Sequence, residues 1–317
     1  MQENGRIILM KNFRSLVVAT IVTGTMLLAG CGGANTQASQ PNNPSQSGSE
    51  ATQSNPSGAE FAINRAINVI SREEGSGTRG AFIELLEIEV DGVDHTSSEA
   101  DIANGTSVVI TSVSGNIYAI GYISLGSLND TVSAISIEGV PATPENVQNG
   151  SYPIFRSFNL AVRELSDVAQ DFLDFVLSAE GQAIVAAGGY IIVDADAPAF
   201  TGGGVSGNVV VTGSTSVAPV MERIAEAYMA VNTNANVEVH SSGSGAGITG
   251  ARDGTADIGM ASREIRPNEL EYVSSITVAH DGLAIIVNND NPLEDLSVEE
   301  IRQVFMGNIH NWSSLLN

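Results

Sequence analysis

The sequence is poor in positive charge, in aromatic side chains and in cysteine. Its 317 residues contain 13 Lys and Arg against 36 Asp and Glu, a formal net charge of −23, and aromatic residues make up 5%. No lysine occurs after Lys11. Because binding to a phosphate backbone needs a basic surface, this balance excludes nucleic acid as a partner. The acidic excess is interpreted as a solvated surface.

The few cysteine and histidine residues exclude several kinds of chemistry. Cys31 is the only cysteine, so no internal disulfide is possible. No G-x-S-x-G nucleophile elbow and no phosphate-binding loop with a lysine occurs. The histidines show no ligand spacing such as H-E-x-x-H: His95, His240, His280 and His310. We therefore expect no catalysis, no metal and no cofactor.

The N-terminus is typical of an export signal. Lys11 and Arg14 precede an apolar run, Leu16 to Leu28, that is short for a bilayer span. Leu28-Ala29-Gly30-Cys31 resembles the lipobox of bacterial lipoproteins, and lipid attachment explains the solitary Cys31. Residues 1–30 are therefore predicted to be a lipoprotein signal peptide. Removal of this segment, which has three positive and one negative side chain, changes the net charge from −23 to −25.

Residues 31–60 are predicted to be a flexible tether. After the cysteine they consist mostly of Gly, Asn, Gln, Ser, Pro and Thr, with almost no large apolar side chain. Such a segment buries too little surface to offset its conformational entropy. We expect a body that the lipid on Cys31 anchors to the cell membrane, on its extracytoplasmic face.

A β-prone run followed by a turn of small residues and then a helical pattern occurs three times. A helix N-terminus leaves backbone N–H groups unpaired and carries partial positive charge. Small residues let an anion approach these groups, and hydroxyls add further donors. The three units indicate an anion site, although one such turn alone is commonly a structural helix cap. The runs and their turns are Asn68–Ile70 with Gly75–Thr78, Val209–Val211 with Gly213–Ser216, and Val237–His240 with Ser241–Gly245.

Dinucleotide binding is the competing interpretation of two of these turns. Residues 75–80 and 245–250 both match G-x-G-x-x-G. That fold also needs a second strand ending in an acidic residue at the appropriate distance, and neither segment is followed by one. We therefore disfavour a Rossmann-type site.

Six blocks of the sequence resemble the PstS family, the phosphate-binding lipoproteins of bacterial phosphate ABC importers. The resemblance extends from about residue 65 to residue 317. It implies an α/β fold of the type II periplasmic-binding-protein class, with two lobes and the ligand in the cleft between them. The blocks are "SREEGSGTRGAF", "FLDFVLSAEGQAIVAAGGY", "VTGSTSVAPVMERIAEAY", "SSGSGAGITGARDGTADIGMASRE", "DGLAIIVNNDNP" and "IRQVFMGNIHNWS".

The order of these blocks is reversed relative to the family, so the chain resembles a circular permutant. A fragment of a tandem arrangement or a mis-assembled reading frame are the rival explanations. Permutation is tolerated where the old chain ends lie close together and the new ends fall in an exposed loop. The expected organisation is lobe II from residues 61–149 with 288–317, and lobe I from residues 150–287 with the permutation linker 194–207.

The resemblance also implies which residues contact the anion. Arg72 is the charged donor, and Glu74 is expected to orient it. The expected phosphate contacts are Arg72, Ser76, Gly77, Thr78, Thr215, Ser216 and Ser244.

Selectivity between phosphate and sulfate requires an acceptor for the proton of monohydrogen phosphate. Some family members have an aspartate after the block resembling "DIGMAS", where this chain has Arg263. Asp281 is the candidate replacement, although it could instead cap the turn before its strand.

The resemblance implies a monomeric, lipid-anchored solute-binding protein that captures inorganic phosphate and delivers it to the permease subunits of an ABC importer. Three alternatives remain open at this point. One is an extracytoplasmic sensor or adhesion module that keeps the fold. Another is a binder of a different tetrahedral oxyanion, and the third is a hydrolase of phosphate esters.

Overall fold

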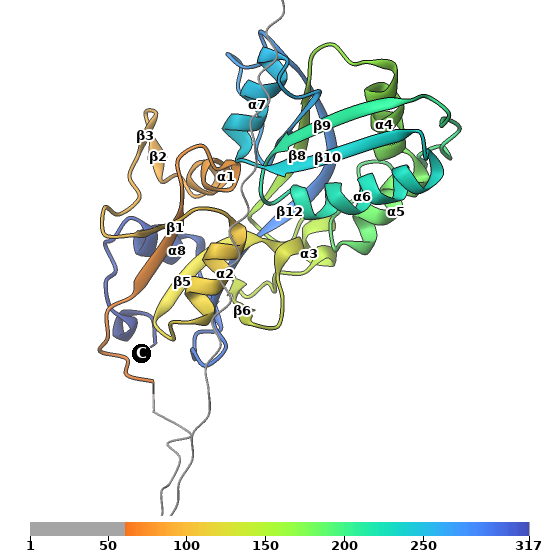
Figure 1. The fold of residues 1–317 in the computed structure, drawn as a ribbon. Coiled ribbons are helices and arrows are strands. Elements are labelled where there is room, and N and C mark those ends of the chain that lie inside the picture. Colours follow the sequence, from red (N-terminus) through yellow and green to blue (C-terminus); the bar gives the residue numbers. More distant parts are fainter. Residues whose placement is uncertain (1–60, 317) are drawn as a thin grey trace, which may run out of the picture. The chain divides into compact units, whose positions relative to one another are not determined.

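One long strand, β12 (Ser274–Asn288), passes between two packed cores and connects them. The computed structural model describes residues 61–316, which belong to one compact unit, Ser57–Asn317. Strand β8 (Phe155–Val162) pairs with the first part of β12, and the last part of β12 pairs with β5 (Ala119–Ser124). β12 therefore extends from one core into the other (Figure 1).

Each core belongs to one half of the described chain. We call residues 61–154 with 283–316 the terminal half, because it holds both ends, and residues 155–282 the middle half. The core of the terminal half surrounds residues such as Trp312, and the core of the middle half surrounds residues such as Tyr228. Both side chains are fully buried.

Six of the remaining strands extend the sheet on both sides of β8 and β12, and the other four form two separate two-stranded sheets in the terminal half. Those of the terminal half are β1 (Asn68–Arg72), β2 (Glu89–Val90), β3 (Val93–Asp94), β4 (Asp101–Ala103), β6 (Val132–Ala134), β7 (Ser136–Ile137) and β13 (Asp295–Leu296). Those of the middle half are β9 (Gly207–Gly213), β10 (Ala235–Ser241) and β11 (Ile258–Ala261). Within residues 61–316 the main sheet has the order β10-β9-β11-β8-β12-β5-β1-β4, with β6 on β12. β10, β9 and β11 are parallel, as are β5, β1 and β4.

Helices follow most of these strands. The terminal half has α1 (Gly77–Leu85), α2 (Thr106–Ser114), η1 (Leu125–Ser127), α3 (Pro144–Gln148), α8 (Val298–Phe305) and η2 (Trp312–Ser314). The middle half has α4 (Asp167–Leu177), α5 (Ala179–Ala187), α6 (Ala218–Val231) and α7 (Ser244–Asp253). Among residues 61–316, no helix combines the length and apolar character needed to cross a bilayer.

The three predicted strand–turn–helix units are confirmed. They are β1 with α1, β9 with α6, and β10 with α7. On α6, apolar residues at helical spacing such as Val220, Ile224 and Tyr228 are buried, and Pro219 lies in the first turn. The periodic pattern and the turn chemistry therefore agree with the tertiary packing.

The connection before β9 lies on the middle half without regular structure of its own. Residues 197–206 form no helix or strand. The carbonyl of Pro198 accepts a hydrogen bond from the N–H of Ala179 at 2.9 Å, and the ring of Phe200 packs edge-on against Phe175 at 5.1 Å. This segment falls within the predicted linker, residues 194–207.

Both ends of the described chain lie side by side in the terminal half. The N–H of Ile67 donates to the carbonyl of His310 at 2.8 Å, and the N–H of Trp312 donates to the carbonyl of Arg65 at 3.2 Å. The ring centroids of Phe61 and Trp312 are 5.6 Å apart. The predicted signal peptide, the tether and Cys31 lie outside the described residues.

Candidate functional site

The three small-residue turns all lie at the carboxyl ends of parallel strands. In open α/β sheets this is the edge where ligands bind. Helices α6 and α7 begin without a side-chain cap, so no side chain accepts a hydrogen bond from their first N–H groups. Ser76 caps α1 by accepting from the N–H of Arg79 at 3.3 Å. The start of α6 is satisfied within the chain instead, because the N–H of Ala218 donates to the carbonyl of Ser214 at 3.0 Å and Pro219 has no N–H.

Two of the turns are hydrogen-bonded to each other across the halves. The hydroxyl groups of Thr78, on α1, and Ser216, before α6, are 2.8 Å apart. Arg72, at the end of β1, donates to the hydroxyl of Thr215 at 3.0 Å. The segments are more than 130 residues apart in the sequence, so only the fold brings these donors together.

Thr106, which the sequence analysis did not identify, completes this group. Its hydroxyl lies 3.4 Å from Nη1 of Arg72, 3.3 Å from Oγ1 of Thr215 and 3.4 Å from Oγ of Ser216. Thr106 is the first residue of α2 and is 7% exposed. We call Arg72, Thr78, Thr106, Thr215 and Ser216 the donor cluster.

A group of three buried serines, the serine triad, adjoins the donor cluster in the middle half. Ser214 donates to the hydroxyl of Ser262 at 2.9 Å, and the N–H of Ser262 donates to the hydroxyl of Ser244 at 3.1 Å. Ser244 was predicted from the sequence, whereas Ser214 and Ser262 were not. Gly77 faces this triad, since a Cβ there would overlap Ser244 and lie 2.8 Å from Oγ of Ser262.

The third turn also contacts the first directly. The N–H of Gly245, at the start of α7, donates to the carbonyl of Gly75 at 3.1 Å. The structure thus brings together seven predicted residues at one junction of the halves: Arg72, Ser76, Gly77, Thr78, Thr215, Ser216 and Ser244.

Glu73, and not the predicted Glu74, orients Arg72. Nε of Arg72 donates to Oε2 of Glu73 at 2.7 Å, and Nη2 donates to Oε1 at 2.7 Å. The N–H of Gly105 also donates to Oε2 of Glu73, at 3.2 Å. Glu74 is exposed, because the chain turns away from the cluster after Glu73. The expectation for Glu74 was therefore wrong by one position.

The electrostatics of Arg72 depend on this pair. Arg72 is 1% exposed, and an isolated buried guanidinium is strongly unfavourable. Burial raises the pKa of Glu73, but hydrogen bonds and charge from Arg72 outweigh this effect and hold the pKa below its ordinary value. Glu73 is therefore ionised at neutral pH and fixes the guanidinium.

Tyr122, on β5, holds the end of β1 in place. Its hydroxyl accepts from the N–H of Arg72 at 3.2 Å and lies 3.0 Å from the hydroxyl of Ser71. Its ring stacks on Phe82 of α1, with centroids 3.8 Å apart and planes inclined by 6°. The strand end and the helix start of the first unit are thus held by one buried side chain.

Asp281 lies in a different hydrogen-bonded group. The Ser124 hydroxyl and the N–H of Gly126 donate to its Oδ1 at 2.9 and 3.3 Å, and Arg156 donates to its Oδ2 at 3.1 Å. Burial raises the pKa of Asp281, although Arg156 opposes the shift. No hydrogen bond among the described residues joins Asp281 to the donor cluster, so its acceptor role stays a prediction.

Two pockets border the junction of the halves. One, of about 560 Å³, includes Thr106 and Thr215 of the donor cluster in its lining, together with Gly126, Ser127 and Arg223. The other, of about 600 Å³, is lined by residues of the third-turn contact and by three arginines: Gly75, Ser76, Gly245, Arg79, Arg263 and Arg266. Only the first of these pockets is lined by members of the donor cluster.

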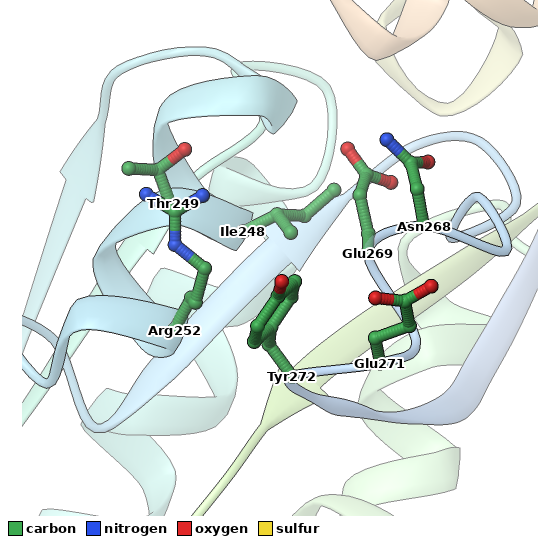
Figure 2. A pocket seen from close by; sticks show the side chains of 7 residues that line it. All are labelled: Ile248, Thr249, Arg252, Asn268, Glu269, Glu271 and Tyr272. Carbon is green, nitrogen blue, oxygen red and sulfur yellow. The ribbon is translucent and has the colours of Figure 1, made fainter.

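A further pocket lies apart from the donor cluster. Figure 2 shows Thr249 and Arg252 on α7 facing Glu269 and Tyr272, which come from the connection before β12. Its lining contains no member of the cluster or of the serine triad. Within residues 61–316, no group of His, Cys, Asp and Glu is arranged to hold a metal ion.

Comparison with known proteins places the chain in a family. A family model described as a PBP superfamily domain matches residues 47–180 and 198–317. Phosphate-binding protein PstS 2 of Streptococcus agalactiae serotype V is 44% identical over 309 residues, which cover 95% of this chain and 97% of the relative. Phosphate-binding protein PstS of Bacillus subtilis is 31% identical over only 115 residues, 35% of this chain and 38% of the relative.

A solved structure agrees with the full-length match. The crystal structure of a phosphate ABC transporter phosphate-binding protein from Streptococcus pneumoniae is 44% identical, with a TM-score of 0.65. The match covers 78% of this chain and 99% of that one. The chain belongs to the PstS phosphate-binding protein family, within the PBP superfamily.

Proposed function

We propose that this protein captures inorganic phosphate at the donor cluster and the adjoining serine triad. The observation that carries the proposal is the convergence of Arg72 and four hydroxyl groups at one junction of the halves. All of these groups are able to donate hydrogen bonds to an oxyanion. The expected contacts are those named from the sequence, with Thr106, Ser214 and Ser262 added.

An acidic protein is able to bind an anion in this way because the donors act locally. Salt screens charges beyond about 10 Å, whereas N–H and O–H groups within hydrogen-bond reach are little affected. Micromolar affinity requires about 8 kcal/mol, and each hydrogen bond to a charged group contributes about 1.5–3 kcal/mol. The donors at this junction are sufficient, with free energy left to order the two halves.

Calorimetric titration of phosphate into the purified protein tests the proposal. Thr78→Val removes a hydroxyl that bridges the halves and should weaken phosphate binding about 10-fold. Thr111→Val is the matched control, because the Thr111 hydroxyl is exposed and bonds only within α2. Absence of phosphate binding by the unaltered protein would overturn the proposal and favour a sensor or adhesion module.

Selectivity is a separate part of the proposal. Asp281 is proposed to accept the proton of monohydrogen phosphate, which fully deprotonated sulfate lacks. The Asp281→Asn variant should then lose its preference for phosphate over sulfate. If this variant still rejects sulfate as strongly, the acceptor is another group, and Glu73, which is bonded to Arg72, is the next to be tested.

Delivery to an ABC importer and anchoring by lipid complete the proposed role. The matched Streptococcus pneumoniae protein is described as the phosphate-binding protein of a phosphate ABC transporter, and Leu28–Cys31 has the pattern of a lipidation signal. The protein is proposed to act as a monomer at the extracytoplasmic face of the cell membrane. Labelled palmitate should be incorporated into the protein in cells and should be absent from Cys31→Ala.

We also propose that the two halves are the lobes of a circularly permuted PstS fold. The blocks resembling the family occur in reversed order, the Bacillus subtilis relative aligns over about a third of the chain, and the family match is interrupted between residues 180 and 198. The terminal half corresponds to lobe II and the middle half to lobe I. The lobes meet at the donor cluster, and the adjacent ends of the described chain support the same interpretation.

A further inference from the structure

Arg156 has buried donors that no group in the described chain accepts. The residue is 5% exposed, and its Nε and Nη1 have no hydrogen-bond partner. Only Nη2 is bonded, to Asp281 at 3.1 Å. A buried guanidinium with two unpaired N–H positions is costly, so this arrangement indicates a partner that is absent from the chain itself.

The backbone places Arg156 where the two halves meet. It lies on β8 directly opposite Asp281 of β12, near the point where β12 passes from the middle to the terminal half. Asp281 in turn accepts hydrogen bonds from Ser124 and the N–H of Gly126, at the carboxyl end of β5. Arg156 is therefore attached, through Asp281, to the ligand-facing edge of the sheet.

Arg72 ends the neighbouring strand at the same edge. β1 and β5 are parallel, with Val69 opposite Ile120. Continuing this register places Arg72 opposite Ile123, the residue before Ser124. Burial lowers the pKa of Arg156, and the positive charge of Arg72 lowers it further, whereas Asp281 raises it.

The loop that Asp281 holds also reaches the pocket beside the donor cluster. Gly126, whose N–H donates to Asp281, and Ser127 line the 560 Å³ pocket together with Thr106 and Thr215. The loop bonded to Asp281 and two members of the donor cluster therefore line the same pocket.

We propose that Arg156 is a second arginine of the oxyanion site, which donates from Nε and Nη1 to the bound anion opposite Arg72. This inference rests on the proposed function. An oxyanion between the two guanidinium groups supplies the missing acceptors and neutralises their mutual repulsion. Asp281 then acts as a positioning residue that holds the third nitrogen of Arg156 and turns the other two toward the ligand.

Calorimetric titration of inorganic phosphate into purified full-length variants tests this role. Arg156→Gln should weaken phosphate binding about 10- to 100-fold, since it removes charge-assisted hydrogen bonds. Arg163→Gln is the matched control, because Arg163 follows the same strand, is exposed and donates to the carbonyl of Arg252.

Arg156→Lys separates ligand contact from a structural ion pair, because it can still pair with Asp281 but lacks the planar donors. If the pair only stabilises the fold, Arg156→Gln should lower the melting temperature but leave the phosphate affinity within 3-fold, and that result would overturn the inference. If Arg156→Gln does not fold, Arg156→Lys keeps the charge but not the planar donors, and a loss of 3-fold or more supports the inference. Unchanged affinity in Arg156→Lys would oppose it. Failure of the unaltered protein to bind phosphate would instead reject the proposed function.

Discussion

At the scale of single residues, the site depends on which of two adjacent carboxylates faces Arg72. Glu73 forms two hydrogen bonds with the guanidinium, while Glu74 is exposed. The sequence places both acids in one turn, and only the backbone path after β1 decides between them.

Thr106 was missed for a different reason. Residues 106–114 are rich in Val, Ile, Thr and Ser, which disfavour a helix, so no helix N-terminus was expected there.

Glu73→Gln should remove part of the acid sensitivity of the fold. The pKa of Glu73 is lowered in the folded protein, so its stabilising contribution is complete above the unfolded value of about 4.3. The contribution is lost as the pH falls through the lowered folded value. Glu73→Gln should therefore melt at a lower temperature at pH 7 and should lose less stability between pH 5 and pH 3.

Melting temperatures between pH 3 and pH 7 measure this effect. Glu74→Gln is the matched control, and its profile should follow that of the unaltered protein. Phosphate affinity at pH 7 should also fall about 10-fold in Glu73→Gln, because Arg72 loses the group that orients it. Identical profiles for the two variants would show that Glu73 does not hold Arg72.

At the scale of elements, the starts of α1 and α7 approach each other closely because small residues occupy both. Gly77 packs against Ser244 and Ser262, and the N–H of Gly245 donates to the carbonyl of Gly75. The strand–turn–helix pattern was sufficient to predict each of these units separately. Their approach from opposite halves was implied only by the family resemblance, since no local pattern encodes contacts between segments so far apart in sequence.

Gly77→Ala should separate these two helix starts. The added Cβ would overlap Ser244, so the helices must move apart or strain the backbone, at a cost of about 1–3 kcal/mol. We expect phosphate affinity to fall by at least 10-fold. Gly80→Ala on the same helix is the control, because its Cβ would meet only the flexible Arg263 side chain, whose Cδ lies nearest at 3.2 Å. Equal phosphate affinities in the two variants, measured by calorimetry, would contradict this packing argument.

At the scale of the whole described chain, the positions of its two ends suggest that the order of segments is exchangeable. Residues 65–67 are hydrogen-bonded to residues 310–312, and residues 197–206 lead into β9 within the middle half without regular structure. The reversed block order was a prediction from the sequence, whereas the proximity of the ends required the fold. Chain ends that lie together can be joined with little change in conformation.

A rearranged gene tests this property. A chain in which residues 208–316 come first and are joined through a short Gly/Ser linker to residues 61–193 should fold to the same structure. It should bind phosphate within about 3-fold of the affinity of the unaltered protein, as measured by calorimetry. A rearranged chain with a native circular dichroism spectrum but no phosphate binding would show that the cluster depends on the present order.

The passage of β12 through both cores has a consequence for how the protein denatures. Its first residues pair with β8 in the middle half, and its last residues pair with β5 and β6 in the terminal half. If either core melts, the other loses a central strand and the backbone hydrogen bonds that the strand provides. The two halves should therefore lose their structure in one cooperative transition, despite having separate hydrophobic interiors.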